Sequence, residues 1–229
     1  MSRNKRILAA VLVCGGLVTV PISAQAAVNS NGVASIATIQ DTAATAGSSV
    51  GSIETVVNGQ ATHLAPIAPC ATAGPLQNSS GNIDAGATRY GRGTTTCAKN
   101  ADGTATATAT GQRFETTVLE QFGGPAIKIR TFSTKCNTTA NGSSGSMELG
   151  GLTGVTVPQN IPANYTVTVP AKKAGDPPLA SVIFNELIAP TPADGSLSTH
   201  TMRIKLFPQG GPGSGDIIVG TASCDPFGD

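Results

Sequence analysis

The fold is decided by three apolar runs near the end of the chain, Leu179-Ala-Ser-Val-Ile-Phe-Asn-Glu186, Thr199-His-Thr-Met-Arg-Ile-Lys-Leu-Phe207 and Asp216-Ile-Ile-Val-Gly-Thr-Ala-Ser-Cys224. Segments rich in Pro, Asp and Gly separate the runs. Apolar runs of this length between turn-forming residues are typical of antiparallel strands that lie side by side. This stretch therefore predicts three neighbouring strands of one sheet.

Shorter patterns earlier in the chain predict further strands. Asn58-Gly59 between two apolar runs predicts a tight hairpin, because both turn positions need a positive φ. Residues 104–110 alternate Thr and Ala without exception, which places the alanines on one face with room for a bulky partner across the core. Residues 126–136 and 165–169 also alternate. The whole pattern predicts an all-β, antiparallel β-sandwich of roughly nine to eleven strands.

Three segments admit more than one interpretation. Residues 114–122 carry a helical apolar stripe, but their β-branched residues favour a strand, which is our prediction. Asn100-Ala-Asp-Gly103 is predicted to be a plain turn, since it lacks the spaced carboxylates and terminal Glu of a calcium loop. Residues 137–146 are predicted to be a flexible polar loop before a short strand at 147–157.

The first 26 residues have the pattern of a secretory signal peptide. Basic residues at the start precede an apolar core at 7–20, which is shorter than the about 20 residues of a permanent transmembrane helix. Ala24 and Ala26 supply the small-x-small cleavage motif, so we expect the mature chain to begin at Ala27. We predict an irregular N-terminal segment at 27–50 and a single β-sandwich domain at 51–229.

The charge balance argues against a nucleic-acid or anionic-membrane partner. The chain has 14 Lys and Arg against 13 Asp and Glu. Three of the basic residues and no acidic residue lie in the leader, so 11 against 13 remain, a net charge of −2. A nearly neutral surface predicts no binding to nucleic acid or to an anionic membrane. The expected partner is an unknown protein or envelope component, with no transmembrane anchor in the mature chain and no cofactor.

Four cysteines remain after removal of the leader: Cys70, Cys97, Cys136 and Cys224. An even number in an exported chain is typical of disulfides, and four cysteines allow three pairings. We favour Cys70–Cys97, which are close in sequence, and Cys136–Cys224, which ties the last strand to one in the middle. A zinc site is the weaker alternative, because there is no Cys-x-x-Cys spacing and there are two histidines.

Part of the sequence resembles a known family. Val182-Ile-Phe-Asn-Glu186, with Asn164-Tyr-Thr-Val-Thr-Val169 before it and Gly215-Asp-Ile-Ile-Val-Gly-Thr-Ala-Ser-Cys224 after it, is similar to the choice-of-anchor P family of actinobacterial exported proteins. The segment from Gly111-Gln-Arg-Phe114 to Cys136 is also similar. The resemblance implies a secreted or wall-associated β domain without a defined biochemical role. Because the chain ends without an apolar tail or sortase-type signal, the resemblance implies a released or non-covalently held protein.

The candidate polar site consists of Asn185, Glu186 and His200. His200 shares strand parity with Met202, which predicts a core-facing, hydrogen-bonded structural histidine. Glu186 lies in a run fit for burial and therefore needs a partner or a raised pKa. The simplest interpretation is that Asn185 and Glu186 bind backbone groups at a strand end. A sharper hypothesis is a Lys–Asn amide crosslink of Lys128 with Asn185, assisted by Glu186.

Catalytic and sugar-stacking patterns are weak. The other histidine, His63, is expected at a strand end, and no Gly-x-Ser-x-Gly motif supplies a serine nucleophile. A carboxylate pair for glycoside hydrolysis could be formed from the glutamates at 115, 120, 148 and 186. The chain has no Trp and two Tyr, which argues against an aromatic sugar-binding platform.

These patterns predict a secreted, non-catalytic structural or interaction module of the cell envelope or extracellular space. The alternatives are a secreted hydrolase that uses Glu186 or His200, and a secreted inhibitor or ligand-binding protein whose loops make the contacts.

Overall fold

The computed structural model describes residues 27–28, 34–35 and 43–228, in two compact units, Met1–Asp41 and Thr42–Asp229. In the first unit, β1 (Ala27–Val28) pairs antiparallel with β2 (Ala34–Ser35). The predicted signal peptide, with Ala24 and Ala26, lies outside the described residues.

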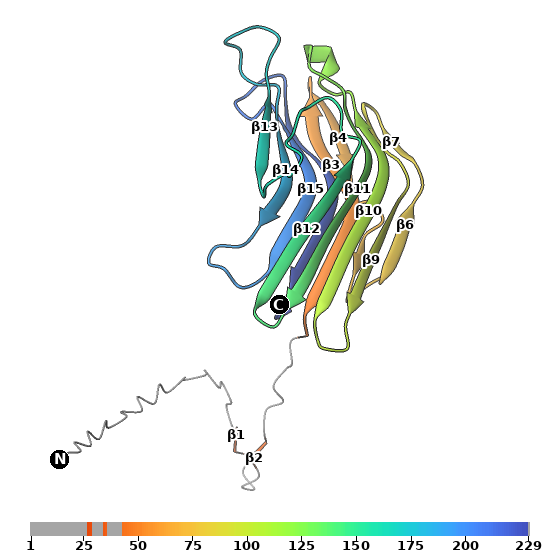
Figure 1. Ribbon diagram of the computed structural model, residues 1–229, viewed down its shortest axis with the longest axis vertical. Coiled ribbons are helices and arrows are strands. Elements are labelled where there is room, and N and C mark those ends of the chain that lie inside the picture. Colours follow the sequence, from red (N-terminus) through yellow and green to blue (C-terminus); the bar gives the residue numbers. More distant parts are fainter. Residues whose placement is uncertain (1–26, 29–33, 36–42, 229) are drawn as a thin grey trace, which may run out of the picture. The chain divides into compact units, whose positions relative to one another are not determined.

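The second unit contains two antiparallel sheets of seven strands each (Figure 1). Sheet I has the strand order β13 (Tyr165–Val169), β14 (Ala180–Ile188), β15 (Leu197–Leu206), β16 (Gly213–Asp225), β3 (Thr45–Val57) and β4 (Gln60–Leu64), with β5 (Cys70–Ala71) also on β3. Sheet II has the order β12 (Gly142–Gly150), β11 (Ile127–Thr139), β10 (Ala105–Thr116), β8 (Thr88–Tyr90) and β7 (Ile83–Ala85), while β9 (Gly93–Lys99) pairs with β10 and β6 (Gln77–Ser80) pairs with β9.

The predicted all-β, antiparallel, disulfide-stapled sandwich is confirmed, with 14 strands in this unit instead of roughly nine to eleven. The additional strands are short and lie in the stretch that contains β5 to β8. The three C-terminal runs form β14, β15 and β16 as adjacent strands, and the Asn58-Gly59 hairpin joins β3 to β4.

Both disulfides connect one sheet to the other. Cys70 of β5 is bonded to Cys97 of β9, and Cys136 of β11 is bonded to Cys224 of β16, which is the pairing favoured from the sequence. The Cα atoms of each pair are 5.8 Å apart. Packed sheets ordinarily lie about 10 Å apart. The sheets therefore approach closely where they are cross-linked.

This close approach explains the composition of the core near the disulfides. Alanines and the four cystine residues fill this region: Ala44, Ala46, Cys70, Cys97, Ala105, Ala107, Cys136, Ala222 and Cys224. The expectation that the alternating alanines leave room for a bulky partner is therefore wrong for Ala105 and Ala107. Large side chains, including Phe114, Phe184 and Met202, fill the other core region.

Two predicted boundaries are corrected. The folded domain does not begin at residue 51, because β3 starts at Thr45 and its small residues Ala46 and Ser48 are buried. Residues 114–122 are not one strand, because β10 ends at Thr116 and η1 (Glu120–Phe122) follows, with Leu119 turned into the large-residue core.

The predicted loop at 137–146 is a hairpin between β11 and β12. Thr139 pairs with Gly142, and Ala140 and Asn141 form the turn. Residues 142–146 contain no apolar side chain, which hid the first half of β12 in the sequence. Gly145 instead allows close packing, since a Cβ atom there would lie 3.0 Å from Leu187 of sheet I.

Candidate functional site

A network of charged side chains crosses β14, β15 and β16 of sheet I. His200 Nδ1 lies 2.6 Å from Glu186 Oε2. Arg203 donates from Nη1 to Glu186 Oε1 at 3.3 Å and from Nη2 to Asp216 Oδ2 at 2.7 Å. Glu186 and His200 are only 7% and 8% exposed, so this pair is shielded from water, whereas Arg203 and Asp216 are partly exposed.

The network lies on the face of sheet I that points away from sheet II. The two neighbours of His200 both face sheet II: Thr201 Oγ1 hydrogen-bonds Thr134 Oγ1 of β11, and Thr199 lies against Gly145 of β12. Because side chains alternate along a strand, His200 points to the opposite face. The prediction that His200 faces the core is therefore wrong, although the histidine is buried and hydrogen-bonded.

A reversal of the side-chain alternation explains this error. On β14, the core-facing positions are Phe184 before Asn185 and Leu187 after it; on β16, they are Val219 before Gly220 and Ala222 after it.

The two reversals lie in one row across the sheet. Asn185 and Thr201 lie between the pairs Phe184–Met202 and Glu186–His200, and Thr201 and Gly220 lie between the pairs Met202–Val219 and His200–Thr221. Asn185 and Gly220 adopt left-handed conformations, with φ of 50° and 63°. An ordinary strand keeps a period of two, so the left-handed residues shift its phase. On β15, between these two strands, the adjacent residues Thr201 and Met202 both face the core, so parity counted from Met202 fails to place His200.

The electrostatics favour an ionised Glu186. Burial of the Glu186 carboxyl opposes its charge, but the hydrogen bond and charge of His200, together with Arg203, outweigh burial and hold its pKa below the ordinary value. The hydrogen bond that Arg203 donates to Asp216 raises the pKa of Arg203. The network thus joins two carboxyl groups, one guanidinium and one imidazole on three neighbouring strands.

An open groove of about 550 Å³ lies next to the network on the same face. Ile188 and Ser198 line the groove, and each is two positions along its strand from Glu186 or His200. Pro190 and the segment 71–73 also contribute to its lining, which is mainly apolar. The groove is large enough for a small ligand.

Asn185 does not join the Glu186–His200 pair. Its Nδ2 donates to the carbonyl oxygen of Ile161 at 3.4 Å, and its own carbonyl accepts from the Asn164 amide. Lys128 lies in sheet II, where its Nζ is 2.7 Å from Glu115 Oε1. The structure therefore separates the proposed crosslink partners, and the Lys128–Asn185 hypothesis is wrong.

The remaining candidates are distributed over both sheets. His63 of β4 pairs with Glu54 of β3, and both side chains are exposed. Glu115 lies on β10, Glu148 lies on β12, and Glu120 lies in η1.

Sequence reasoning missed Arg203 and Asp216. They are diagonal neighbours on β15 and β16. Asp216 pairs with Lys205, and Arg203 lies two residues before Lys205, where it pairs with Ile218. Their opposite charges on adjacent predicted strands were the available signal. The register between those strands was not available from the sequence.

Within residues 27–28, 34–35 and 43–228, no group of three or more His, Cys, Asp or Glu side chains is arranged to hold a metal ion. In the same part of the chain, no helix has the length and apolar character needed to cross a membrane. Comparisons of the chain with protein-family models, curated proteins and solved structures found no match.

Proposed function

We propose that this protein is exported and acts as a non-catalytic structural or interaction module of the cell envelope or extracellular space. The observation that carries the proposal is the pair of buried disulfides between the two sheets. Disulfides form and persist in oxidising compartments. The signal-peptide pattern of residues 1–26 supports the same location.

The arrangement of the charged network supports a non-catalytic role. Glu186, His200 and Arg203 bind one another on the sheet, and little of Glu186 or His200 is open to solvent. Groups that satisfy one another in this way stabilise a framework. We also propose membership of the choice-of-anchor P family, on the resemblance of residues 164–169, 182–186 and 215–224.

The test is capture of a partner by the purified mature chain from fractionated cell envelope and culture medium of its host. Saturable binding of one envelope component, lost after the protein is reduced and unfolded, is the expected result. Recovery of the protein in the cytoplasm with four free thiols would contradict the proposal.

A secreted hydrolase is the second candidate, because the Glu186–His200 pair lies beside the groove. In that case His200→Gln would abolish hydrolysis of ester or glycoside substrates and leave binding in the groove intact. An absence of turnover with the wild-type protein on both substrate classes removes this candidate.

A further inference from the structure

The two sheets carry opposite net charges, although the mature chain is nearly neutral. The strands of sheet II hold six basic residues, Arg89, Lys99, Arg113, Lys128, Arg130 and Lys135, against Asp84, Glu115 and Glu148, a net charge of +3. The strands of sheet I hold Arg203 and Lys205 against Glu54, Glu186, Asp216 and Asp225, a net charge of −2. The near-zero total therefore conceals a basic face.

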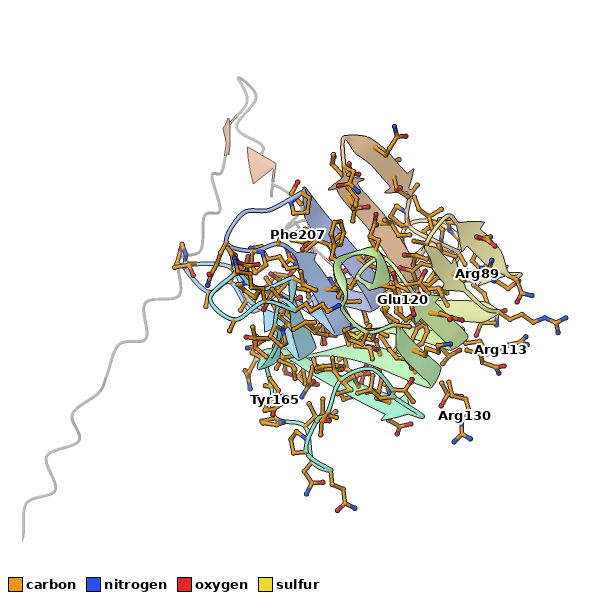
Figure 2. The ribbon with its side chains drawn as sticks, turned by 90° about the horizontal axis from the view of Figure 1, so that it is seen from above. Arg89, Arg113, Glu120, Arg130, Tyr165 and Phe207 are labelled. Carbon is orange, nitrogen blue, oxygen red and sulfur yellow. A yellow bond between two sulfur atoms is a disulfide. The ribbon has the colours of Figure 1, made fainter. Side chains whose placement is uncertain are left out.

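The arginines are concentrated in one part of this face. Of the five arginines after residue 26, all except Arg203 lie on sheet II or in the link between β8 and β9. Arg113 of β10 lies opposite Arg130 of β11, between the pairs Gln112–Thr131 and Phe114–Ile129. Figure 2 shows Arg89, Arg113 and Arg130 along the same side of the molecule.

Arg92 extends this row toward β9. Its carbonyl accepts a hydrogen bond from the Gln112 amide at 3.0 Å, so Arg92 lies beside the residue that precedes Arg113. Arg92, Arg113 and Arg130 are all exposed. We call these three residues the arginine row.

Glycines on either side make room for the row. A Cβ atom at Gly151 would lie 2.6 Å from the Cβ and 3.2 Å from the Nε of Arg130. A Cβ atom at Gly91 would lie 3.1 Å from the Cβ of Arg113. The side chains of Arg130 and Arg113 thus occupy space that any other residue at these positions would fill.

The row is unfavourable for the isolated protein. Like charges directly opposite each other on neighbouring strands are destabilising. Arg113 also has φ of 52°, a left-handed conformation that is uncommon for a residue with a long side chain. None of the three arginines forms an ion pair with another described residue. An anionic ligand would relieve the repulsion and supply the missing partners.

Two hollows adjoin the row. One, of about 400 Å³, is lined by Arg89 and Arg113 and also by Asp84 and Glu115, which pair with Arg89 and Lys128. The other, of about 280 Å³, is lined by Arg92 together with hydroxyl and amide side chains: Thr94, Thr110, Gln112 and Thr131. Guanidinium groups bind carboxylate and sulfate in a bidentate manner, and Thr and Gln side chains can hydrogen-bond the hydroxyl groups of a sugar.

We propose that the arginine row is a binding site for an acidic polysaccharide, whose anionic groups pair with Arg92, Arg113 and Arg130. This inference rests on the proposed function and specifies the class of partner. Recognition depends on charge and hydrogen bonds, without aromatic stacking. Single-stranded nucleic acid stacks its bases on aromatic side chains, and the aromatic residues that line the two hollows, Tyr90 and Phe132, are buried.

The experiment measures binding of the mature full-length chain to heparin and to polygalacturonate, with dextran as the neutral polymer and duplex DNA as an unrelated polyanion. The test variant is Arg92→Gln/Arg113→Gln/Arg130→Gln. The matched control, Lys172→Gln/Lys173→Gln/Lys205→Gln, removes the same charge from exposed lysines elsewhere. Wild type is expected to bind both acidic polymers more tightly than DNA, in a salt-dependent manner, and not to bind dextran.

The test variant is expected to lose about tenfold or more in affinity, and the control to stay within about twofold. Equal losses in both variants, no binding of wild type to either acidic polymer, or tighter binding to DNA would overturn the proposal. Should the triple variant fail to fold, Arg113→Asn provides the test, because Asn tolerates the left-handed conformation. If the wild type captures an envelope component and the test variant captures it equally well, the proposed site is wrong and the proposed function still stands.

Discussion

At the scale of single residues, the protein contains two Glu–His pairs that differ in burial. Glu54 pairs with His63 across β3 and β4, and Glu186 pairs with His200 across β14 and β15. The first pair is exposed, whereas the second is buried and also bound by Arg203. Water screens an exposed ion pair strongly, so the buried pair should dominate the electrostatic contribution to stability.

Glu186→Gln is expected to lower the free energy of unfolding at neutral pH by about 1–3 kcal/mol, because it leaves His200 and Arg203 with a weaker partner. The pKa of Glu186 is lowered in the fold, so its contribution is present above the ordinary value of 4.5 and is lost as the pH falls through the lower folded value. Urea unfolding between about pH 7 and pH 3 measures this, and the variant should show a smaller loss on acidification than wild type.

Glu54→Gln is the matched control for this prediction. It alters the exposed pair and should change the free energy of unfolding by less than about 1 kcal/mol. An effect at Glu54 as large as that at Glu186 would show that burial does not govern these interactions.

At the scale of elements, Tyr90 is a point of close contact between the two sheets. Tyr90 of β8 reaches into sheet I, where its hydroxyl donates to the carbonyl of Ile218 at 2.8 Å and approaches the carbonyl of Ser52 at 3.1 Å. Gly51 leaves the space that the Tyr90 ring occupies. Burial raises the pKa of Tyr90, which keeps the hydroxyl proton available as a donor.

Gly51→Ala is expected to lower the free energy of unfolding by about 2–3 kcal/mol, because the added methyl group would meet the Tyr90 ring and lie 2.5 Å from the Ile218 carbonyl oxygen. Denaturant unfolding provides the measurement. Gly81→Ala serves as the control, since a Cβ atom there has no neighbour within 4 Å. Equal stability of the two variants would mean that the Tyr90 contact is not tightly packed.

At the scale of the whole molecule, the sandwich is cross-linked at one end and filled by large side chains elsewhere. The Cys136–Cys224 disulfide spans 88 residues of sequence and the Cys70–Cys97 disulfide spans 27. A longer closed loop removes more conformational entropy from the unfolded chain.

Replacement of Cys136 and Cys224 by Ala is therefore expected to cost more stability than replacement of Cys70 and Cys97 by Ala, by about 1 kcal/mol. Unfolding of the two double variants and of wild type in guanidinium chloride gives the comparison. Wild type with a reducing agent should be less stable than either variant. The opposite order of the two variants would indicate that native packing outweighs loop entropy.

Local patterns in the sequence accounted for most of the fold. The apolar runs, the Thr–Ala alternation and the Asn-Gly turn each reflect contacts between residues that are close in sequence, so they can be recognised without coordinates. The first half of β12, residues 142–146, was missed because its Gly and Ser residues carry no apolar signal. The alternating alanines were recognised, but their small partners depend on the approach of the two sheets.

The sequence by itself determined that this is an antiparallel, disulfide-linked β-sandwich, because backbone periodicity and cysteine number are properties of the linear chain. Tertiary structure alone decided which face carries Glu186 and His200, and that Arg203 and Asp216 complete their network. It also decided that three arginines from distant segments share one row on a chain of nearly zero net charge. These features depend on strand register and on left-handed residues within strands, which set the neighbours of a side chain across the sheet.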